Sequence, residues 1–295
     1  MKQLVVLAAS FMLIFAACSQ NDSTTSPPET GSLELNISGL ADLGTTAKYE
    51  GWLIVNDMPV STGKFTVDAS GQMSETSFEV SSSDLDNATT FILTVEPEPD
   101  PSTDPSDVHL IAGDFSGNSA SLSIGHSAAL GDDFSSATGK YILATPTTSD
   151  TMDENSGIWF LDLSSGMPAV GLSLPTLPAG WKYEGWTVIS GIPVTSGKFT
   201  AVDVVDESDP YSNSENPGPP FPGEDYVQNP PLGLTFPTML DGGIAVISIE
   251  PDPDNSPDPF LLKPLTGTVP DPATDHVTYN MTNQSAGNPT GTAMR

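Results

Sequence analysis

The sequence predicts an all-β protein with two tandem antiparallel domains, each a β-sandwich or barrel-like fold, behind a signal peptide and a flexible tether. Short apolar runs rich in β-branched and aromatic residues are bounded by turn residues, and apolar residues nowhere recur at helical spacing over a dozen positions. The 28 prolines and 26 glycines interrupt these runs often, which favours short strands. A long internal repeat indicates that the domain occurs twice.

The N-terminus has the pattern of a lipoprotein signal peptide. Lys2 precedes an unbroken run of apolar and small residues from Leu4 to Ala17, which at 14 residues is shorter than the ~20 that a membrane-spanning helix needs. The run ends in Phe-Ala-Ala followed by Cys18, which resembles the bacterial lipobox, whose cysteine is acylated after cleavage. Cys18 is the only cysteine in the chain, which favours lipidation over an ordinary secretory peptide cut near Ala17.

We therefore expect residues 1–17 to be removed, Cys18 to carry the lipid, and the polar residues 18–32 to form a flexible tether. The membrane is then a partner through the lipid anchor, and the cell envelope is the expected location. Ser19 stands where an aspartate would resemble an inner-membrane retention signal, so the outer membrane is favoured over the inner one.

The charge of the chain excludes one class of partner. Removing the signal peptide leaves 38 acidic residues against 7 basic ones. Nucleic acid is excluded as a partner because phosphate contacts need clustered lysine and arginine. The lone cysteine allows no intramolecular disulfide, so ordinary hydrophobic cores must hold the domains together.

Two segments of the chain repeat each other. Residues 47–68 and 181–203 share Lys-Tyr-Glu-Gly-Trp, Pro-Val and Gly-Lys-Phe-Thr blocks with the same internal spacing. A second pair of segments, 91–100 and 245–254, ends in Glu-Pro-x-Pro-Asp both times. A two-unit repeat of such long period indicates two whole domains and not a solenoid.

The second copy carries an insertion. Tyr49 and Tyr183 are 134 residues apart, whereas Glu96 and Glu250 are 154 apart, so the second copy has 20 extra residues. They fall in 204–231, a stretch rich in Asp, Glu, Pro, Ser and Asn. We expect this stretch to protrude as an irregular surface loop whose removal leaves folding largely intact.

The repeat sets the expected domain boundaries. The first β domain is expected at 33–130 and the second at 170–282, followed by a disordered tail at 283–295. Residues 131–169 form a linking segment with extra strand candidates that fits either domain. Individual strands are expected at 33–37, 52–55, 91–95, 141–143, 158–161 and 244–249.

The repeated Tyr-Glu-Gly-Trp, Pro-Val, Gly and Glu-Pro pattern resembles the extracytoplasmic C-terminal domain of anti-sigma-K factors (RskA-like). The resemblance implies an all-β domain with framework residues at Tyr49, Trp52, Pro59, Gly63, Glu96 and Pro97, and again at Tyr183, Trp186, Pro193, Gly197, Glu250 and Pro251. Anti-sigma members of the family carry a cytoplasmic helical region and a membrane helix before this domain, whereas here a short tether follows the signal peptide. We therefore expect any sigma regulation to be indirect.

No catalytic motif accompanies these features, so we expect a non-catalytic binding or structural protein with an envelope partner that the sequence does not identify. The three histidines, His109, His126 and His276, lack the spacing of a zinc site. No Gly-x-Ser-x-Gly elbow and no phosphate-binding glycine loop occurs.

The alternative function is a calcium- or glycan-binding surface module. No cofactor is expected apart from Ca²⁺, for which the weak candidate ligands are Glu96, Glu98, Asp100, Glu250, Asp252 and Asp254. These tracts lack the glycine turn of an EF-hand loop, and solvated acidic loops are the simpler interpretation. Glu50 and Glu184 are expected to point outward from a strand. Trp52, Trp159 and Trp186 form either a sugar-stacking platform or, more simply, part of the core.

Overall fold

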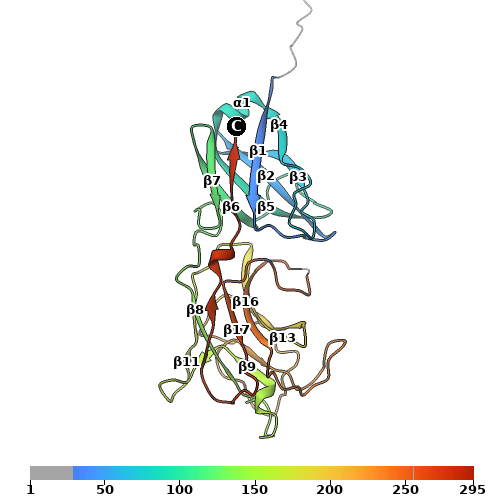
Figure 1. Ribbon diagram of the computed structural model, residues 1–295, viewed down its shortest axis with the longest axis vertical. Helices are drawn as coiled ribbons and strands as arrows, with labels where there is room; N and C mark the ends of the chain where they lie inside the picture. The colour runs from blue at the N-terminus through green and yellow to red at the C-terminus, as the bar shows by residue number, and fades with distance from the viewer. Residues whose placement is uncertain (1–28, 255) are drawn as a thin grey trace, which may run out of the picture.

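The computed structural model describes residues 29–254 and 256–295. The expected signal peptide at 1–17, the lipidation site at Cys18 and the tether up to residue 28 lie outside the described residues. The described chain is nearly all β and its strands pair in antiparallel fashion, as the sequence predicts. Figure 1 shows an upper half, which contains the C-terminus, and a lower half below it.

In the described residues, the upper half is an eight-stranded antiparallel sheet with one short helix. Its elements are β1 (Thr30–Ser38), β2 (Ala47–Val55), β3 (Met58–Phe65), β4 (Ser77–Ser81), α1 (Ser82–Asn87), β5 (Ala88–Pro97), β6 (His109–Ser116), β7 (Ser119–Ser123) and β20 (Thr290–Met294). The strand order is β3-β2-β5-β6-β7-β20-β1-β4. The sheet curls until the ring centroids of Phe65 on β3 and Phe78 on β4 lie 5.9 Å apart, so this half is barrel-like.

Strand β1 begins earlier than the sequence suggests. Its residues alternate between exposed and buried, with Leu33, Leu35 and Ile37 in the core, as expected for a half-buried strand. Thr30 already pairs with Ser81 of β4, so the tether expected to reach residue 32 is shorter. Strands pair through backbone groups, so the residues from Thr30 to Ser32 can join the sheet although none of them is a large apolar residue. The apolar alternation by which the strand is predicted starts only at Leu33.

The lower half consists of short strands in two larger sheets and one strand pair. Its elements are β8 (Thr138–Leu143), η1 (Glu154–Ser156), β9 (Gly157–Trp159), β10 (Leu161–Asp162), β11 (Ala169–Val170), β12 (Leu172–Ser173), β13 (Trp181–Ile189), β14 (Ile192–Phe199), β15 (Gly223–Asp225), β16 (Ile244–Pro251), β17 (Leu265–Thr268), β18 (Tyr279–Asn280), β19 (Thr282–Asn283) and η2 (Ser285–Gly287). The sheets have the orders β14-β13-β16-β17-β19 and β12-β8-β9-β15. The linking segment 131–169 lies in this half, because its strand β8 pairs with β9, β12 and β18.

The two repeats form the same three-stranded arrangement. In the upper half β2 lies between β3 and β5, and in the lower half β13 lies between β14 and β16. Tyr49 pairs with Phe65 and Val95, and Tyr183 pairs with Phe199 and Ile249, so the register is the same in both copies. Both copies also have a β-bulge, opposite Gly51 in the upper half and opposite Gly185 in the lower half.

The C-terminal residues form an interior strand, and the disordered tail expected at 283–295 is therefore wrong. Each of the five residues of β20 pairs with both β1 and β7. Ala293 is fully buried, and a Cβ added at Gly291 would lie 2.5 Å from the carbonyl oxygen of Asn36, so this strand needs small residues. The resulting Thr-Gly-Thr-Ala-Met sequence buries only Ala293 and has no alternation of large apolar residues, which is why it looks like a tail.

Arg295 fastens the end of β20 to the surrounding loops. Its Nη1 donates to the carbonyl oxygens of Leu85 and Ala88, the latter at 2.7 Å, and its Nη2 donates to the carbonyl oxygen of Gly117 at 3.0 Å. The guanidinium also lies 4.4 Å above the ring of Phe115, a distance typical of a cation–π contact.

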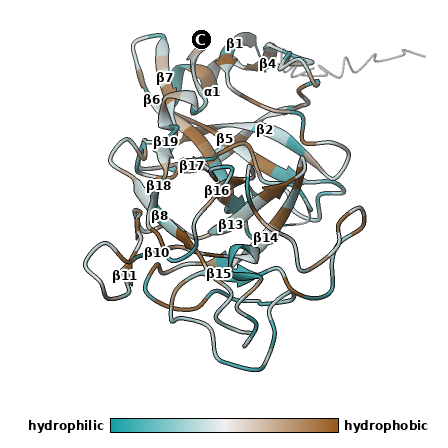
Figure 2. Cartoon of the chain, turned by 60° about the horizontal axis from the view of Figure 1, so that its bottom comes forward, coloured by the Kyte–Doolittle hydropathy of each residue, from teal (hydrophilic) through white to brown (hydrophobic). Residues whose placement is uncertain are grey.

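The hydrophobic core continues from the upper half into the lower half. At the junction the rings of Phe134 and Tyr183 meet edge to face at 6.5 Å, and the amide of Asn283 donates to the carbonyl oxygens of Phe134 and Ala137. Figure 2 shows the hydrophobic residues on the strands and much of the hydrophilic sequence on the loops around them. Within 29–254 and 256–295, no helix is long and apolar enough to cross a membrane.

Candidate functional site

Each repeat places the same set of charged side chains on its central strands and on the loop that follows. The upper carboxylate network consists of Lys48, Glu50, Lys64, Glu96, Glu98 and Asp100. The lower carboxylate network consists of the matching residues Lys182, Glu184, Lys198, Glu250, Asp252 and Asp254. The pairs that face each other across the strands are Glu50–Lys64, Lys48–Glu96, Glu184–Lys198 and Lys182–Glu250.

A shared β-bulge lies in the strand that faces Glu50 and Glu184, with Thr62 of β3 and Ser196 of β14 as the extra residues. The register shifts after Gly51 and after Gly185, and the facing residues Gly63 and Gly197 have φ of 120° and 109°, which side chains rarely adopt. A Cβ at Gly51 would lie 2.4 Å from the Thr62 hydroxyl, so only glycine fits there. The repeated Glu-Gly-Trp and Gly-Lys-Phe blocks thus encode the bulge.

The bulge also supplies a hydroxyl donor to each glutamate. The Ser61 hydroxyl donates to Glu50 at 2.5 Å, and the Thr195 hydroxyl donates to Glu184 at the same distance. Glu50 and Glu184 are 6% and 4% exposed, so the expectation that they point outward is wrong. Glu50 follows the strand alternation on the face opposite Tyr49 and Leu53, but that second face is covered too, as the buried Trp52 on it shows.

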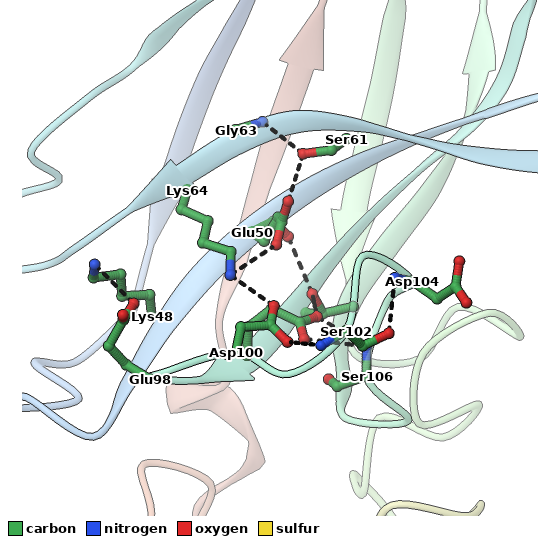
Figure 3. A network of polar contacts seen from close by, with 12 residues as sticks. Lys48, Glu50, Ser61, Gly63, Lys64, Glu98, Asp100, Ser102, Asp104 and Ser106 are labelled. Atoms are coloured by element: carbon green, nitrogen blue, oxygen red, sulfur yellow. Dashed lines mark hydrogen bonds and ion pairs between the residues drawn. The ribbon is translucent and has the colours of Figure 1, made fainter.

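In the upper network, lysines pair with most of the carboxylates (Figure 3). Lys64 Nζ lies 3.5 Å from Glu50 Oε2 and 2.7 Å from Asp100 Oδ2, and this ammonium holds the pKa of Asp100 below its ordinary value. Lys48 pairs with Glu98 at 2.8 Å.

The buried Glu96 is held by neutral donors. It accepts the Thr94 hydroxyl and, at 2.9 Å, the backbone N–H of Ser106. Every buried carboxylate oxygen of the upper network has a partner, as far as the described residues go.

The lower network is less completely paired. Lys198 Nζ contacts Asp254 Oδ2 at 3.0 Å, and Lys182 Nζ bridges Glu207 at 2.9 Å and Asp252 at 3.5 Å. Glu250 accepts the backbone N–H of Phe260 at 2.8 Å. One oxygen each of Glu184, Glu250 and Asp254 lie within 4.8 Å of one another.

Burial raises the pKa of two carboxyl groups in the lower network. Desolvation raises the pKa of Glu184 to about 7 and that of Glu250 to about 7, and the negative charge of Asp254 acts in the same direction on both.

Of the six calcium candidates, the structure brings Glu250 and Asp254 together with a third carboxylate, Glu184. Glu98 instead forms an ion pair with Lys48, and Asp252 forms one with Lys182.

The three tryptophans considered for sugar stacking are buried. Trp52, Trp159 and Trp186 are 3%, 4% and 3% exposed, so they offer no open ring face. Their indole N–H groups donate to Thr94 at 2.9 Å, to Asp225 at 2.8 Å and to Ser248 at 2.8 Å, and the rings therefore belong to the framework.

A groove of about 610 Å³ separates the two networks at the junction of the halves. Residues 41–47, 95–97 and 106–108 form its upper wall, and parts of 251–263 form its lower wall. The segments that end β5 and follow β16 therefore both contribute to its walls. Of the six calcium candidates, Asp252 and Asp254 line the groove, whereas Glu96, Glu98 and Asp100 do not.

The insertion 204–231 is not a simple surface loop, contrary to the sequence-based expectation. Its strand β15 pairs with β9, and Glu224, Asp225 and Tyr226 are fully buried. Asp225 accepts the Trp159 indole N–H, and its other oxygen accepts the N–H and hydroxyl of Thr147 at 2.8 and 2.5 Å. The acidic composition of the insertion gives no sign that part of it is buried. Tyr226, the aromatic residue next to Asp225, is the feature of the sequence that indicates burial.

The buried acids of the insertion predict a pH-dependent stability. Desolvation raises the pKa of Asp206 to about 7 and that of Glu224 to about 8. A raised folded-state pKa contributes stability that is fully present below the unfolded pKa of about 4 and is lost as pH rises through the folded value. The free energy of unfolding in urea should therefore fall, by on the order of 2–3 kcal/mol, between about pH 5.5 and pH 8.5.

The matched variant for this prediction is Glu224→Gln, whose amide does not ionise. It should make the fall with pH shallower, because Asp206 still titrates, and it should be more stable than the natural chain at about pH 8.5. Carboxylates with lowered pKa, such as Asp100, are fully ionised above about pH 5 and leave this range unaffected. A stability that stays constant or rises over this range would contradict the prediction.

No protein-family model, no curated protein and no solved structure matches the chain.

Proposed function

We propose that this chain is a non-catalytic lipoprotein of the cell envelope, anchored by a lipid on Cys18, whose two anti-sigma-K-like repeats form a binding module. Any effect on a sigma factor then passes through a separate membrane protein. The observation that carries the proposal is the groove at the junction, because segments of both halves, among them parts of both repeats, form its walls. The anti-sigma-K resemblance of the repeats supports the envelope assignment.

The polar networks support a non-catalytic role. The hydroxyls of Thr94 and Ser61 donate to the neighbouring carboxylates Glu96 and Glu50 within the sheet. A nucleophile needs a base that accepts its proton beside an open substrate site, whereas these groups are enclosed by strands. Their arrangement therefore serves the framework and not turnover.

The chemistry of the groove favours a basic, partly apolar segment of an envelope protein as its occupant. Its apolar lining residues are partly or fully buried and include Leu43, Val95, Val108, Phe260 and Leu261. Its exposed aspartates are Asp42, Asp107, Asp252 and Asp258. The lining lysine, Lys263, is already occupied by the carbonyl oxygens of Pro259 and Phe260. Complementary charge would steer a cationic segment to this groove, and the apolar lining would hold it.

The test is photo-cross-linking in cells that carry the lipid-anchored chain. A photoreactive residue at Asp258, in the groove, should give one discrete adduct with an envelope protein that exposes a basic segment. The same residue at Asp86, in α1 at the far end of the upper half, should give none (Figure 1).

Cys18→Ser provides the matched control for the anchor. The variant should leave the membrane fraction for the soluble exported fraction, because a lipid chain is what holds the natural protein there. Equal adducts from Asp258 and Asp86, unchanged membrane partitioning of the variant, direct binding to a sigma factor, or turnover in a broad hydrolase screen would each overturn the proposal.

A further inference from the structure

Three carboxylates converge in the lower network from separate parts of the chain. Glu184 comes from β13, Glu250 from β16, and Asp254 from the loop that follows β16. Glu184 and Glu250 are 4% and 0% exposed, and the side chain of Asp254 is 7% exposed. One oxygen of each lies within 4.8 Å of the other two, so three potential negative charges share one enclosed space.

Two buried oxygens in this space have no partner. Glu184 Oε1 accepts the Thr195 hydroxyl and Glu250 Oε1 accepts the N–H of Phe260. Within the residues that the structure describes, the Oε2 atoms of both glutamates have no hydrogen-bond donor and no solvent. A buried, ionised carboxylate oxygen without a donor or a cation is strongly disfavoured, so these two atoms are placed to coordinate a cation.

The upper network shows how the same arrangement is satisfied by the chain itself. There Lys64 lies within 4 Å of both Glu50 and Asp100, and the Thr94 hydroxyl donates to Glu96. In the lower network Lys198 forms an ion pair with Asp254 and with neither glutamate. Thr94 and its counterpart Ser248 lie 3.4 and 3.5 Å from the carbonyl oxygens of Glu50 and Glu184, but the hydrogen bond to the neighbouring carboxylate is the one from Thr94 to Glu96.

We propose that Glu184, Glu250 and Asp254 bind one divalent cation, Ca²⁺ in preference to Mg²⁺. Hard oxygen ligands suit Ca²⁺, whose bonds of about 2.3–2.6 Å place ligand oxygens up to about 5 Å apart. Mg²⁺ has a smaller, stricter shell and usually keeps several waters with one or two carboxylates. The site goes beyond the proposed function because it needs no partner protein.

Such a cation would link the loop that lines the groove to the sheet. Asp254 and Phe260 line the groove, and Phe260 donates its backbone N–H to Glu250. A Ca²⁺ held by Asp254 and the two glutamates would therefore join the lower wall of the groove to β13 and β16. The lower copy would use a metal ion where the upper copy uses Lys64.

The experiment is calorimetric titration of Ca²⁺ into the purified, chelator-treated chain. One site per chain is expected, with a Kd on the order of 0.1–1 mM, as in extracellular calcium modules. Glu184→Gln and Glu250→Gln should each weaken binding at least about tenfold, because each removes a ligand charge. Glu50→Gln and Glu96→Gln, at the matching positions of the upper network, should leave Kd unchanged.

A second variant keeps the test decisive should the glutamine variants fail to fold. Lys198→Met removes the ammonium that competes for Asp254, so it should tighten Ca²⁺ binding without adding a ligand. The proposal is wrong if no binding is detected up to about 10 mM Ca²⁺, well above the Kd of such modules. It is equally wrong if Glu50→Gln and Glu184→Gln weaken binding alike, if Mg²⁺ binds as tightly, or if Lys198→Met weakens binding.

Discussion

Deletion of residues 290–295 should unfold the upper half of the molecule. The deletion removes β20 from the interior of the sheet, which breaks the ladders to both β1 and β7 and exposes the side of the core that Ala293 covers. We expect a loss of at least about 4 kcal/mol in the free energy of unfolding, the range reached when buried hydrogen-bonded networks are broken. Hydrogen exchange should show that the amides of β1 and β7 lose protection.

Arg295→Ala is the matched control for this deletion. It retains the whole of β20 and removes only the guanidinium contacts with three carbonyl oxygens and the Phe115 ring. Its cost should be about 1–3 kcal/mol, and β1 should remain protected. Retention of protection in β1 and β7 after the deletion would show that these strands pair without β20.

Asp225→Ala should destabilise the lower half by about 3 kcal/mol or more. The change leaves the indole N–H of Trp159 and the N–H and hydroxyl of Thr147 without an acceptor in the protein interior. Each buried donor without a partner costs roughly 1–3 kcal/mol. Deletion of residues 206–225 removes β15 as well, and we expect that variant to lose the fold of the lower half.

Asp225→Asn keeps one acceptor oxygen and should be less harmful than the alanine variant. Met152→Ser, at a residue that is 82% exposed in the same half, should be neutral within about 0.5 kcal/mol. Chemical denaturation followed by tryptophan fluorescence gives these values, since Trp159 itself contacts Asp225. Native-like stability of the 206–225 deletion would restore the view of the insertion as a dispensable loop.

The repeat explains which features can be predicted from the sequence. The alternation of Leu33, Leu35 and Ile37 predicts β1, and the paired Lys-Tyr-Glu-Gly-Trp blocks predict two strands that the structure places in the same register. These predictions succeed because side-chain periodicity and local turn chemistry act over a few residues.

The features that the sequence conceals depend on distant contacts. β20 has small residues, Gly291 and Ala293, where it is crowded by β1 and the core, and a segment without alternating large apolar residues has no local signal for that place. Asp225 is buried because Thr147 and Trp159 surround it with donors, which an acidic composition does not indicate. The candidate site is similar: Glu250 and Asp254 lie in a tract that stands out by charge, whereas Glu184 is brought to them by the pairing of β13 with β16.

The position of β20 has a consequence for the order in which the molecule is completed. A chain is synthesised from its N-terminus, so β1 to β7 exist long before the strand that must separate β1 from β7. All the strands of the lower half, which end at Asn283, precede β20 as well. The half that is first in sequence is therefore the last to close. This inverted order keeps the leading part of the described chain open until residues 290–294 have been made.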